Sequence, residues 1–165
     1  MTGRIITVAQ QKGGSGKTTL AANLACAWRR EGARVALIDT DPQGSLGRWF
    51  MERLGTLPAD EGLEFSTSSA WGAAYKADKL KRRFDLIIID TPPKIDSDLR
   101  PALRAADLVL VPVASSQVDL WATEGVLDLA AREKRPALVV LNRTRPGTRL
   151  GAEIAAGAGQ LGAEV

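Results

Sequence analysis

Short apolar runs alternate along the chain with longer stretches in which apolar residues recur at helical spacing. The runs are rich in Val, Ile and Leu, which is typical of strands buried on both faces of a parallel sheet. We expect strands at residues 5–9, 35–39, 63–66, 85–90, 108–113 and 137–142. We expect helices at residues 18–30, 45–54, 70–83, 98–106, 120–133 and 149–161. The alternation predicts an α/β fold of three layers, a mostly parallel β-sheet flanked by helices, in a single domain over residues 1–165.

A glycine-rich loop lies between the first predicted strand and the first predicted helix. It reads Lys12-Gly13-Gly14-Ser15-Gly16-Lys17-Thr18-Thr19. Glycines let backbone N–H groups close on polyphosphate oxygens, and the following helix directs its positive end at the same place. We expect Lys17 to neutralise β- and γ-phosphate charge and the Thr18 hydroxyl to hold Mg²⁺.

The loop departs from the standard phosphate-binding pattern, which has a glycine where this chain has Gln11. A glycine-rich turn that binds nothing is the alternative. The Lys-Thr pair after the last glycine and the flanking strand and helix favour the phosphate site.

Carboxylates follow two of the other predicted strands. Asp39 and Asp41 come at the end of one strand, and Asp90 ends another after four apolar residues. In a parallel sheet the carboxyl ends of the strands meet at one edge, where ligands bind. We expect Asp90 to hold a water on Mg²⁺. For Asp39 and Asp41 the alternative is an Asp-x-Asp-Pro turn with a capping carboxylate, and for Asp90 it is a solvent-facing turn residue.

Composition excludes several chemistries. The sequence has no histidine, so a Ser-His-Asp triad and a histidine-ligated zinc mechanism are excluded. It has one cysteine, which excludes an internal disulfide. The formal charge of +3 permits contact with a polyanion besides a nucleotide. The longest apolar runs are too short to span a bilayer and the first residues lack the order of a signal peptide, so we expect a cytoplasmic protein without a membrane partner.

The two-lysine loop resembles the deviant Walker A motif of the ParA/MinD family of P-loop ATPases, whose fold is of the SIMIBI type. Two further segments resemble that family's motifs: residues 37–44, Leu-Ile-Asp-Thr-Asp-Pro-Gln-Gly, and the Walker B segment at residues 86–93, Leu-Ile-Ile-Ile-Asp-Thr-Pro-Pro. The Asp-Pro-Gln-Gly spelling favours the ParA branch, whose members act in DNA partition and cargo positioning.

The resemblance implies roles for the charged residues. Lys12 is the signature lysine, which acts in trans across a homodimer that sandwiches two ATP molecules. Asp41 polarises the attacking water and Asp39 belongs to the shell of metal-bound water, although these two roles are exchangeable. The predicted catalytic residues are therefore Lys12, Lys17 and Asp41, and the predicted Mg²⁺ site consists of Thr18, Asp39 and Asp90.

The predicted nucleotide site also includes the whole loop and a residue near the end of the chain. Asn142 ends the last predicted strand, and the family places an asparagine here for recognition of adenine; a turn-forming asparagine is the alternative. The predicted nucleotide-binding residues are Lys12, Gly13, Gly14, Ser15, Gly16, Lys17, Thr18, Thr19 and Asn142.

The surfaces that would bind DNA or a partner protein are less clearly marked in the sequence. ParA-branch proteins bind DNA without sequence preference, and Arg143, Arg145 and Arg149 lie where such a surface would form. A second basic group, from Lys76 to Arg83, is more typical of a solvated helix face. The resemblance further implies a small activating partner of the ParB type or a cargo adaptor, and association with the nucleoid.

The sequence departs from the family at its end, where the usual final strand and helix are not found. We expect either a C-terminally truncated chain or an unusually short member. The function that we expect is a Mg²⁺-ATP-dependent dimerisation switch with slow ATP hydrolysis, in plasmid or chromosome partition or in positioning a protein cluster. A metabolic enzyme of the same superfamily, such as a dethiobiotin-synthetase-like ligase, and a non-hydrolysing nucleotide-binding regulator are the alternatives.

Overall fold

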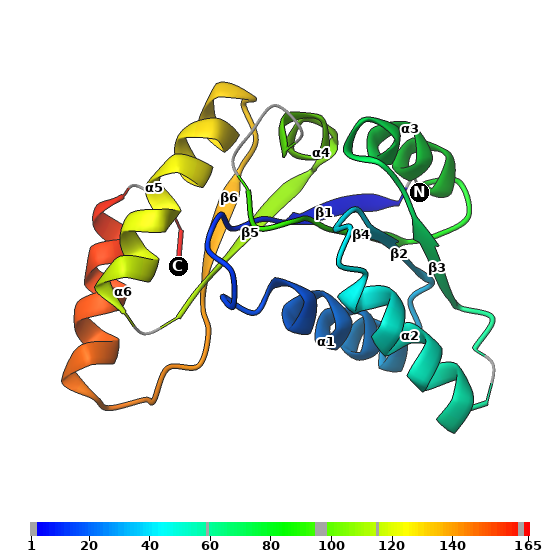
Figure 1. Ribbon diagram of the computed structural model, residues 1–165, viewed down its shortest axis with the longest axis horizontal. Coiled ribbons are helices and arrows are strands. Elements are labelled where there is room, and N and C mark those ends of the chain that lie inside the picture. The colour runs from blue at the N-terminus through cyan, green and yellow to red at the C-terminus, as the bar shows by residue number, and fades with distance from the viewer. Residues whose placement is uncertain (1–2, 59, 95–98, 115, 162–163) are drawn as a thin grey trace.

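A parallel sheet forms the centre of the protein (Figure 1). The computed structural model describes residues 3–58, 60–94, 99–114, 116–161 and 164–165. Within these residues the sheet has six strands in the order β3-β2-β4-β1-β5-β6, and each neighbouring pair is parallel. The strands are β1 (Arg4–Val8), β2 (Val35–Asp39), β3 (Leu63–Thr67), β4 (Leu86–Asp90), β5 (Leu108–Val113) and β6 (Ala137–Leu141). The helices are α1 (Lys17–Arg30), α2 (Ser45–Thr56), α3 (Ala70–Leu80), α4 (Leu99–Ala105), α5 (Gln117–Arg132) and α6 (Arg149–Gln160).

Each predicted strand and helix is present, and the bounds shift by a few residues. The prediction was wrong about the start of α5, which begins at Gln117 rather than at residue 120, because Ser116 caps it by accepting a hydrogen bond from Asp119 N. It was also wrong about the end of α3, which stops at Leu80 rather than at residue 83. There a tight turn directs Phe84 into the core. The predicted first residue of α4, Asp98, lies outside the described residues, as does Ser115.

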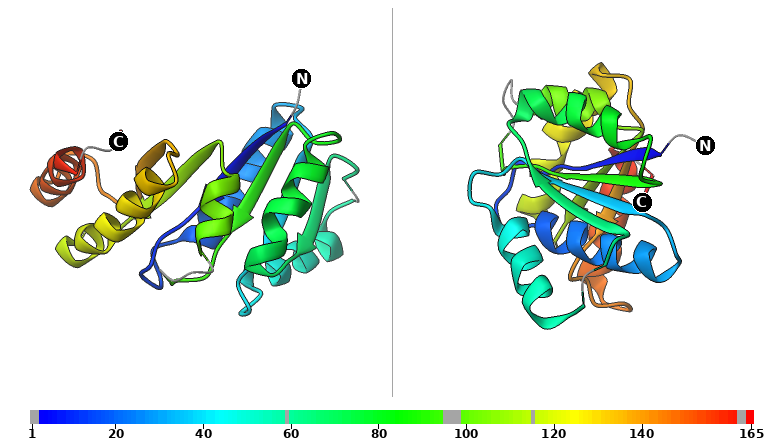
Figure 2. Two further views of the ribbon diagram at one scale, coloured as in Figure 1. Left: turned by 90° about the horizontal axis from the view of Figure 1, so that it is seen from above. Right: turned by 90° about the vertical axis from the view of Figure 1, so that its right-hand side faces the viewer.

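Helices cover both faces of the sheet (Figures 1 and 2). Alternate strand residues face opposite ways: Val35 and Leu37 pack toward α1 and α2, whereas Ala36 and Ile38 pack toward α3. Burial of an Ile or Leu side chain of this kind contributes about 1.5–3 kcal/mol, so the central strands anchor the fold. Helix α6 lies at the β6 end, where Ile154 packs against β5, β6 and α5.

The strand ends position the candidate site. Asp90, the last residue of β4, pairs in register with Val8 at the end of β1 and with Asp39 at the end of β2. The glycine-rich loop leaves β1 at the same edge. The expectation that these segments converge is therefore confirmed by the register. Among the described helices, none combines the length and apolarity that crossing a bilayer requires.

Candidate functional site

The loop between β1 and α1 has the backbone of an anion cradle. Gly14 and Gly16 have φ angles of 76° and 94°, in the left-handed region that glycine adopts without strain. Gly16 is also the N-cap of α1. It offers no side-chain cap, and the first turn of the helix carries no acidic residue. The first N–H groups of α1 therefore have no side-chain cap, as expected at a phosphate site.

Lys17 is buried at the start of α1 near two carboxylates. Burial lowers the pKa of Lys17, and the charges of Asp90 and Asp41 oppose that shift. The ammonium therefore lies in a partly desolvated place where a phosphate would be a strong partner.

Thr18 and Asp90 form the candidate Mg²⁺ site. Thr18 Oγ1 donates a hydrogen bond to Asp90 Oδ2 at 2.7 Å. The other carboxylate oxygen, Asp90 Oδ1, is buried without a hydrogen-bond partner. Burial raises the pKa of Asp90 to about 6. A buried carboxylate oxygen with no donor beside a threonine hydroxyl fits a hard cation, or a water on it, so the residues present suit Mg²⁺.

Asp39 and Asp41 both make local turns, as in the alternative raised from the sequence. Asp39 Oδ1 accepts from Asp41 N at 3.0 Å, and its Oδ2 accepts from Gly47 N in the first turn of α2 at 3.2 Å. Asp41 Oδ1 accepts from Gln43 N at 2.9 Å. Burial raises the pKa of Asp39. Both carboxylate oxygens of Asp39 therefore accept backbone hydrogen bonds near the start of α2. The side chain of Asp41 is half-buried.

An open pocket of about 810 Å³ lies beside these carboxylates. Asp39 and Asp41 line it from the β2 side, and Lys94 lines it from the segment after β4. The opposite wall is formed by the loop from β3 to α3, residues 67–70. A water molecule or a small acceptor would have room here.

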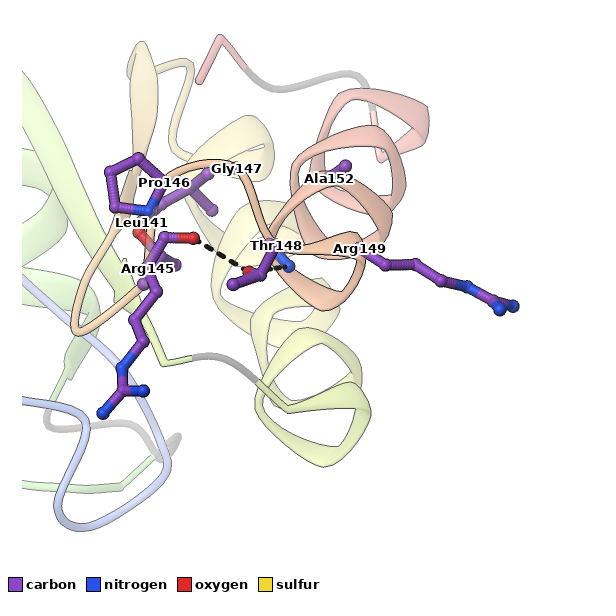
Figure 3. Close-up of a pocket in the computed structure, with 9 residues that line it drawn as sticks. Leu141, Arg145, Pro146, Gly147, Thr148, Arg149 and Ala152 are labelled. Atoms are coloured by element: carbon purple, nitrogen blue, oxygen red, sulfur yellow. Dashed lines mark hydrogen bonds between the residues drawn. The ribbon is translucent and has the colours of Figure 1, made fainter.

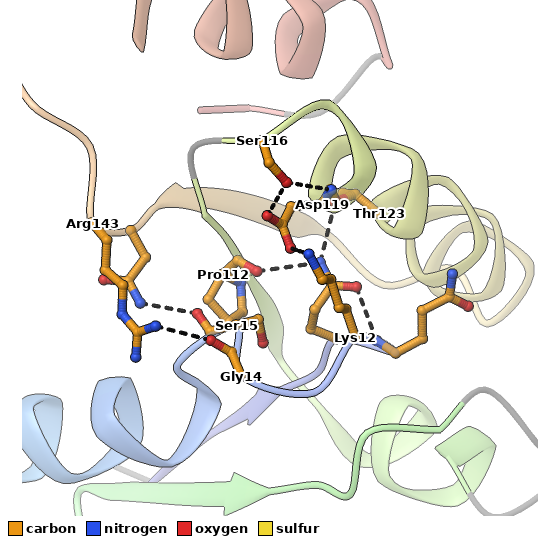
Figure 4. Close-up of polar contacts among 11 residues, drawn as sticks. Lys12, Gly14, Ser15, Pro112, Ser116, Asp119, Thr123 and Arg143 are labelled. Atoms are coloured by element: carbon orange, nitrogen blue, oxygen red, sulfur yellow. Dashed lines mark hydrogen bonds and ion pairs between the residues drawn. The ribbon is translucent and has the colours of Figure 1, made fainter. Parts of the chain in front are cut away.

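Lys12 points away from the cradle in this conformation. Its Nζ lies 2.6 Å from Asp119 Oδ1 on α5 (Figure 4). The side chain of Asp119 is 7% exposed and that of Lys12 is 39% exposed, so Lys12 remains accessible at the surface. Asp119 also accepts a hydrogen bond from Ser116 Oγ.

Gln10 is a structural element of the site that sequence reasoning missed. It is buried, and its Nε2 donates to Pro112 O on β5 and to Thr123 Oγ1 on α5. Its Oε1 accepts from Gln11 N at the loop entrance. A polar residue directly after a buried strand was the available signal. Asp119 was missed as well, because nothing near it in the sequence marks a contact with Lys12.

The end of β6 reaches the cradle from the other side. Asn142 Nδ2 donates to Ser15 O at 3.0 Å. Arg143 Nη1 donates to Gly14 O at 3.1 Å (Figure 4). Asn142 is therefore brought to the predicted nucleotide site, and Arg143 lies on the loop as well.

The other two predicted DNA-contacting arginines lie beyond this loop. Arg145 and Arg149 line an open pocket of about 460 Å³ between β6 and α6. Their side chains point away from each other on either side of Thr148 (Figure 3). Arg149 is paired with Glu153 one turn along α6.

Comparison with known proteins agrees with this geometry. The family model of the CobQ/CobB/MinD/ParA nucleotide binding domain matches residues 6–158. The chain is 33% identical over 147 residues to "Maintenance of carboxysome distribution protein A" of Halothiobacillus neapolitanus, covering 86% of this chain and 67% of that protein. It is 35% identical over 153 residues to the chromosome-partitioning ATPase Soj of Thermus thermophilus, covering 78% of this chain and 60% of that one. The chain thus spans about two thirds or less of the length of these relatives.

Solved structures share the fold. An ATP complex of McdA from Cyanothece superposes with a TM-score of 0.80 at 19% identity, over 97% of this chain and 79% of that one. Cobyrinic acid a,c-diamide synthase of Mycobacterium smegmatis, with bound ADP and magnesium, has a TM-score of 0.78 at 23% identity, over 95% of this chain and 81% of that one. The sheet and its flanking helices are those of P-loop NTPases. The chain belongs to the CobQ/CobB/MinD/ParA family of nucleotide-binding domains, and its relatives place it with the ParA branch.

Proposed function

We propose that the protein is a Mg²⁺-ATP-dependent dimerisation switch that hydrolyses ATP slowly. The observation that carries this proposal is the pair of lysines on one phosphate loop: Lys17 is buried beside Asp90, and Lys12 is accessible and held outside the cradle. In this proposal Lys17 serves the nucleotide of its own subunit, and Lys12 serves the nucleotide of a second subunit. ParA-branch relatives act in chromosome partition and in the distribution of carboxysomes, so the switch would position DNA or a protein cluster.

The cis part of the mechanism follows from the cradle. Lys17 and the N–H groups from Gly13 to Thr19 would bind the phosphate oxygens, and Thr18 and Asp90 would hold the metal. When bound, Mg²⁺ neutralises charge that builds on the phosphoryl oxygens during transfer. Asp41 suits the role of orienting the attacking water better than Asp39, because hydrogen bonds from Asp41 N and Gly47 N occupy both oxygens of Asp39.

The trans part of the mechanism requires Lys12 to leave Asp119. In a homodimer that sandwiches two ATP molecules, Lys12 of each subunit would neutralise charge on the partner's nucleotide, as an arginine finger does. Dimerisation would then be a condition for hydrolysis.

Replacement of Lys12 by alanine tests this mechanism. The K12A protein should bind Mg²⁺-ATP as a monomer but lose ATP-dependent dimerisation and turnover, measured by light scattering after size exclusion and by phosphate release. Wild-type dimerisation and turnover in K12A would exclude a trans lysine.

Asn142 is the proposed adenine reader. Its Nδ2 donates to Ser15 O, which leaves the carboxamide oxygen to accept from the exocyclic amine of adenine. Guanine carries a carbonyl at that position, so ATP should bind more tightly than GTP. Equal affinities for ATP and GTP would remove this assignment.

DNA and a partner protein are the proposed macromolecular ligands. Arg145 and Arg149 lie on and beside the loop after β6, and they are the proposed phosphate contacts, while Arg143 faces Gly14. Non-specific DNA binding of this kind falls steeply with salt and would place the protein on the nucleoid in the cytoplasm. A small activating protein of the ParB type, or a cargo adaptor, would stimulate turnover. Retention of the ATP-bound protein on arbitrary duplex DNA at low salt, lost at high salt, is the expected result.

A ligase is the second candidate, because the pocket of about 810 Å³ beside Asp41 has room for a small acceptor. A regulator that binds nucleotide without hydrolysis is the third. Phosphate release distinguishes them. Slow turnover that DNA and a partner raise supports the switch, dependence on a small acceptor supports the ligase, and no turnover supports the regulator.

A further inference from the structure

The carbonyl side of the phosphate loop is held by the end of β6. The carboxamide of Asn142 donates to Ser15 O at 3.0 Å. The guanidinium of Arg143 donates to Gly14 O at 3.1 Å (Figure 4). Ser15 O is an acceptor, so the nitrogen of the Asn142 side chain is the atom that faces it. Two consecutive peptide groups of the loop are therefore fixed by neighbouring residues more than a hundred positions later in the sequence.

Fixing these carbonyls also fixes the N–H groups. In a trans peptide the C=O of one residue and the N–H of the next point in opposite directions. If Gly14 O points at Arg143, the N–H of Ser15 points away from it. If Ser15 O points at Asn142, the N–H of Gly16 points away as well. Those are the groups that a cradle with left-handed Gly14 and Gly16 presents to an anion.

Two features show that the contact is built into the fold. A Cβ on Gly16 would lie 2.2 Å from Asn142 Nδ2, so Asn142 approaches the loop at a distance that only glycine permits. Arg143 itself has a φ of 58°, a conformation that is uncommon for residues other than glycine, asparagine and aspartate. The backbone at the end of β6 thus adopts an unfavourable conformation while its side chain reaches Gly14.

We propose that Asn142 and Arg143 are positioning residues of the phosphate cradle: they hold the carbonyl oxygens of Ser15 and Gly14 and thereby direct the N–H groups of Gly16 and Ser15 toward the nucleotide phosphates. This inference rests on the proposed nucleotide site and goes beyond the role of base reader proposed for Asn142. It also couples recognition of the base to binding of the phosphates, because Asn142, which would contact the base, holds the loop that would contact the phosphates.

The test compares Arg143→Met, Arg143→Lys and Asn142→Leu with the wild type. Arg30→Met is the matched control, because Arg30 is exposed at the far end of α1 and its replacement removes the same charge. Backbone amide NMR signals of Ser15 and Gly16 are recorded without ligand, and affinity is then measured for Mg²⁺-ATP and for Mg²⁺-pyrophosphate, which has no base. Thermal unfolding of each variant shows whether it is folded.

The expected result has two parts. The Ser15 and Gly16 signals move in ligand-free Arg143→Met and Asn142→Leu but not in Arg30→Met, and pyrophosphate binding weakens about tenfold in the first two variants. Arg143→Lys, which keeps a charged donor, recovers most of that loss.

Three outcomes would overturn the inference. Unmoved Ser15 and Gly16 signals together with weakened binding would mean that Arg143 contacts phosphate directly. A loss confined to ATP would mean that Asn142 only reads the base, and a loss equal to that of Arg30→Met would mean that only net charge matters. If the wild type binds neither pyrophosphate nor ATP, the proposed function fails, while the ligand-free signals still decide whether the loop is held. If Asn142→Leu does not fold, the Arg143 pair decides the question.

Discussion

Lys12 Nζ lies 2.6 Å from Asp119 Oδ1 in the same chain, so the lysine proposed to act on a second nucleotide is bound to its own α5. Burial of Asp119 raises its pKa, but the hydrogen bonds from Lys12 and Ser116 outweigh that effect and hold the pKa below its ordinary value. Asp119 is therefore ionised at neutral pH, and its ion pair with Lys12 must break before Lys12 reaches another subunit.

The first prediction concerns that ion pair. Asp119→Asn removes the charge but keeps an acceptor for Ser116, so Lys12 is released while the cap of α5 is preserved. An ion pair with one accessible partner is worth about 1 kcal/mol, which corresponds to roughly fivefold in an equilibrium constant. Each homodimer releases two such lysines, so we expect ATP-dependent dimerisation to strengthen by roughly 25-fold, the square of that factor, measured by analytical ultracentrifugation at several protein concentrations.

The control for this experiment is Asp128→Asn, an exposed residue on the same helix. It makes the same change of charge without touching Lys12 and should leave the dimerisation constant unaltered. Equal strengthening in both variants would show that the net charge of α5, and not the Lys12 contact, governs association.

Much of the fold could be read from local pattern. The strand at residues 35–39 was predicted with the bounds that the structure gives β2, because five consecutive buried residues leave little ambiguity. The start of α5 was harder to predict, because the apolar pattern alone suggests a later start than Gln117, where the Ser116 cap begins the helix. The phosphate loop and Asp90 were placed correctly at one edge, because in a parallel sheet the position of strand ends follows from connectivity.

Contacts made by side chains distant in sequence could not be read in the same way. Nothing near Asp119 marks it as the partner of Lys12, and nothing near Asn142 shows that its amide holds Ser15 O. The turn formed by Asp39 and Asp41 was available as an alternative, but the choice depends on Gly47 N lying within reach of Asp39. Such distances follow from packing, which no short pattern encodes.

The second prediction is a pH dependence that originates at Asp90. Its pKa in the folded protein is about 6, above the ordinary value of about 3.9. A raised carboxyl pKa contributes stability that is fully present below the unfolded pKa and is lost as the pH rises through the folded value. Asp90→Asn carries no charge at any pH. The free energy of unfolding of Asp90→Asn, relative to that of the wild type, should therefore be about 2 kcal/mol higher at pH 8 than at pH 4.

Denaturant unfolding at the two pH values measures this difference in the Mg²⁺-free and nucleotide-free protein. Asp78→Asn, at an exposed position on α3, is the control and should show no such pH dependence. A constant difference between Asp90→Asn and the wild type from pH 4 to pH 8 would mean that Asp90 is not desolvated.

The third prediction concerns the hydroxyl that supports Asp90. Thr18→Val keeps the shape of the side chain but removes the hydrogen bond that Asp90 Oδ2 accepts from Thr18, so Oδ2 loses that partner while Oδ1 already has none. The free energy of unfolding at pH 7 should fall by about 1–3 kcal/mol. Thr18→Ser retains the donor and should lose less. If Asp90→Asn is already present, Thr18→Val should have a smaller effect, and strict additivity of the two changes would contradict a direct coupling.

The last prediction ranks the loop glycines by what a methyl group would meet. At Gly13 a Cβ has nothing within 4 Å and φ is not in the left-handed region, so Gly13→Ala should change the free energy of unfolding by less than about 1 kcal/mol. At Gly14 the space is open but φ is 76°, so alanine should lose about 1–2 kcal/mol through backbone strain. At Gly16 the φ of 94° combines with a Cβ only 2.2 Å from Asn142 Nδ2, so alanine should lose more than Gly14→Ala. Adding Asn142→Ala to Gly16→Ala should recover the steric part but neither the backbone part nor the hydrogen bond to Ser15 O, because it clears the contact, leaves φ unchanged and removes the donor. Urea unfolding of the four variants measures the series, and a Gly16→Ala protein as stable as Gly13→Ala would show that the loop does not hold Asn142 at this distance.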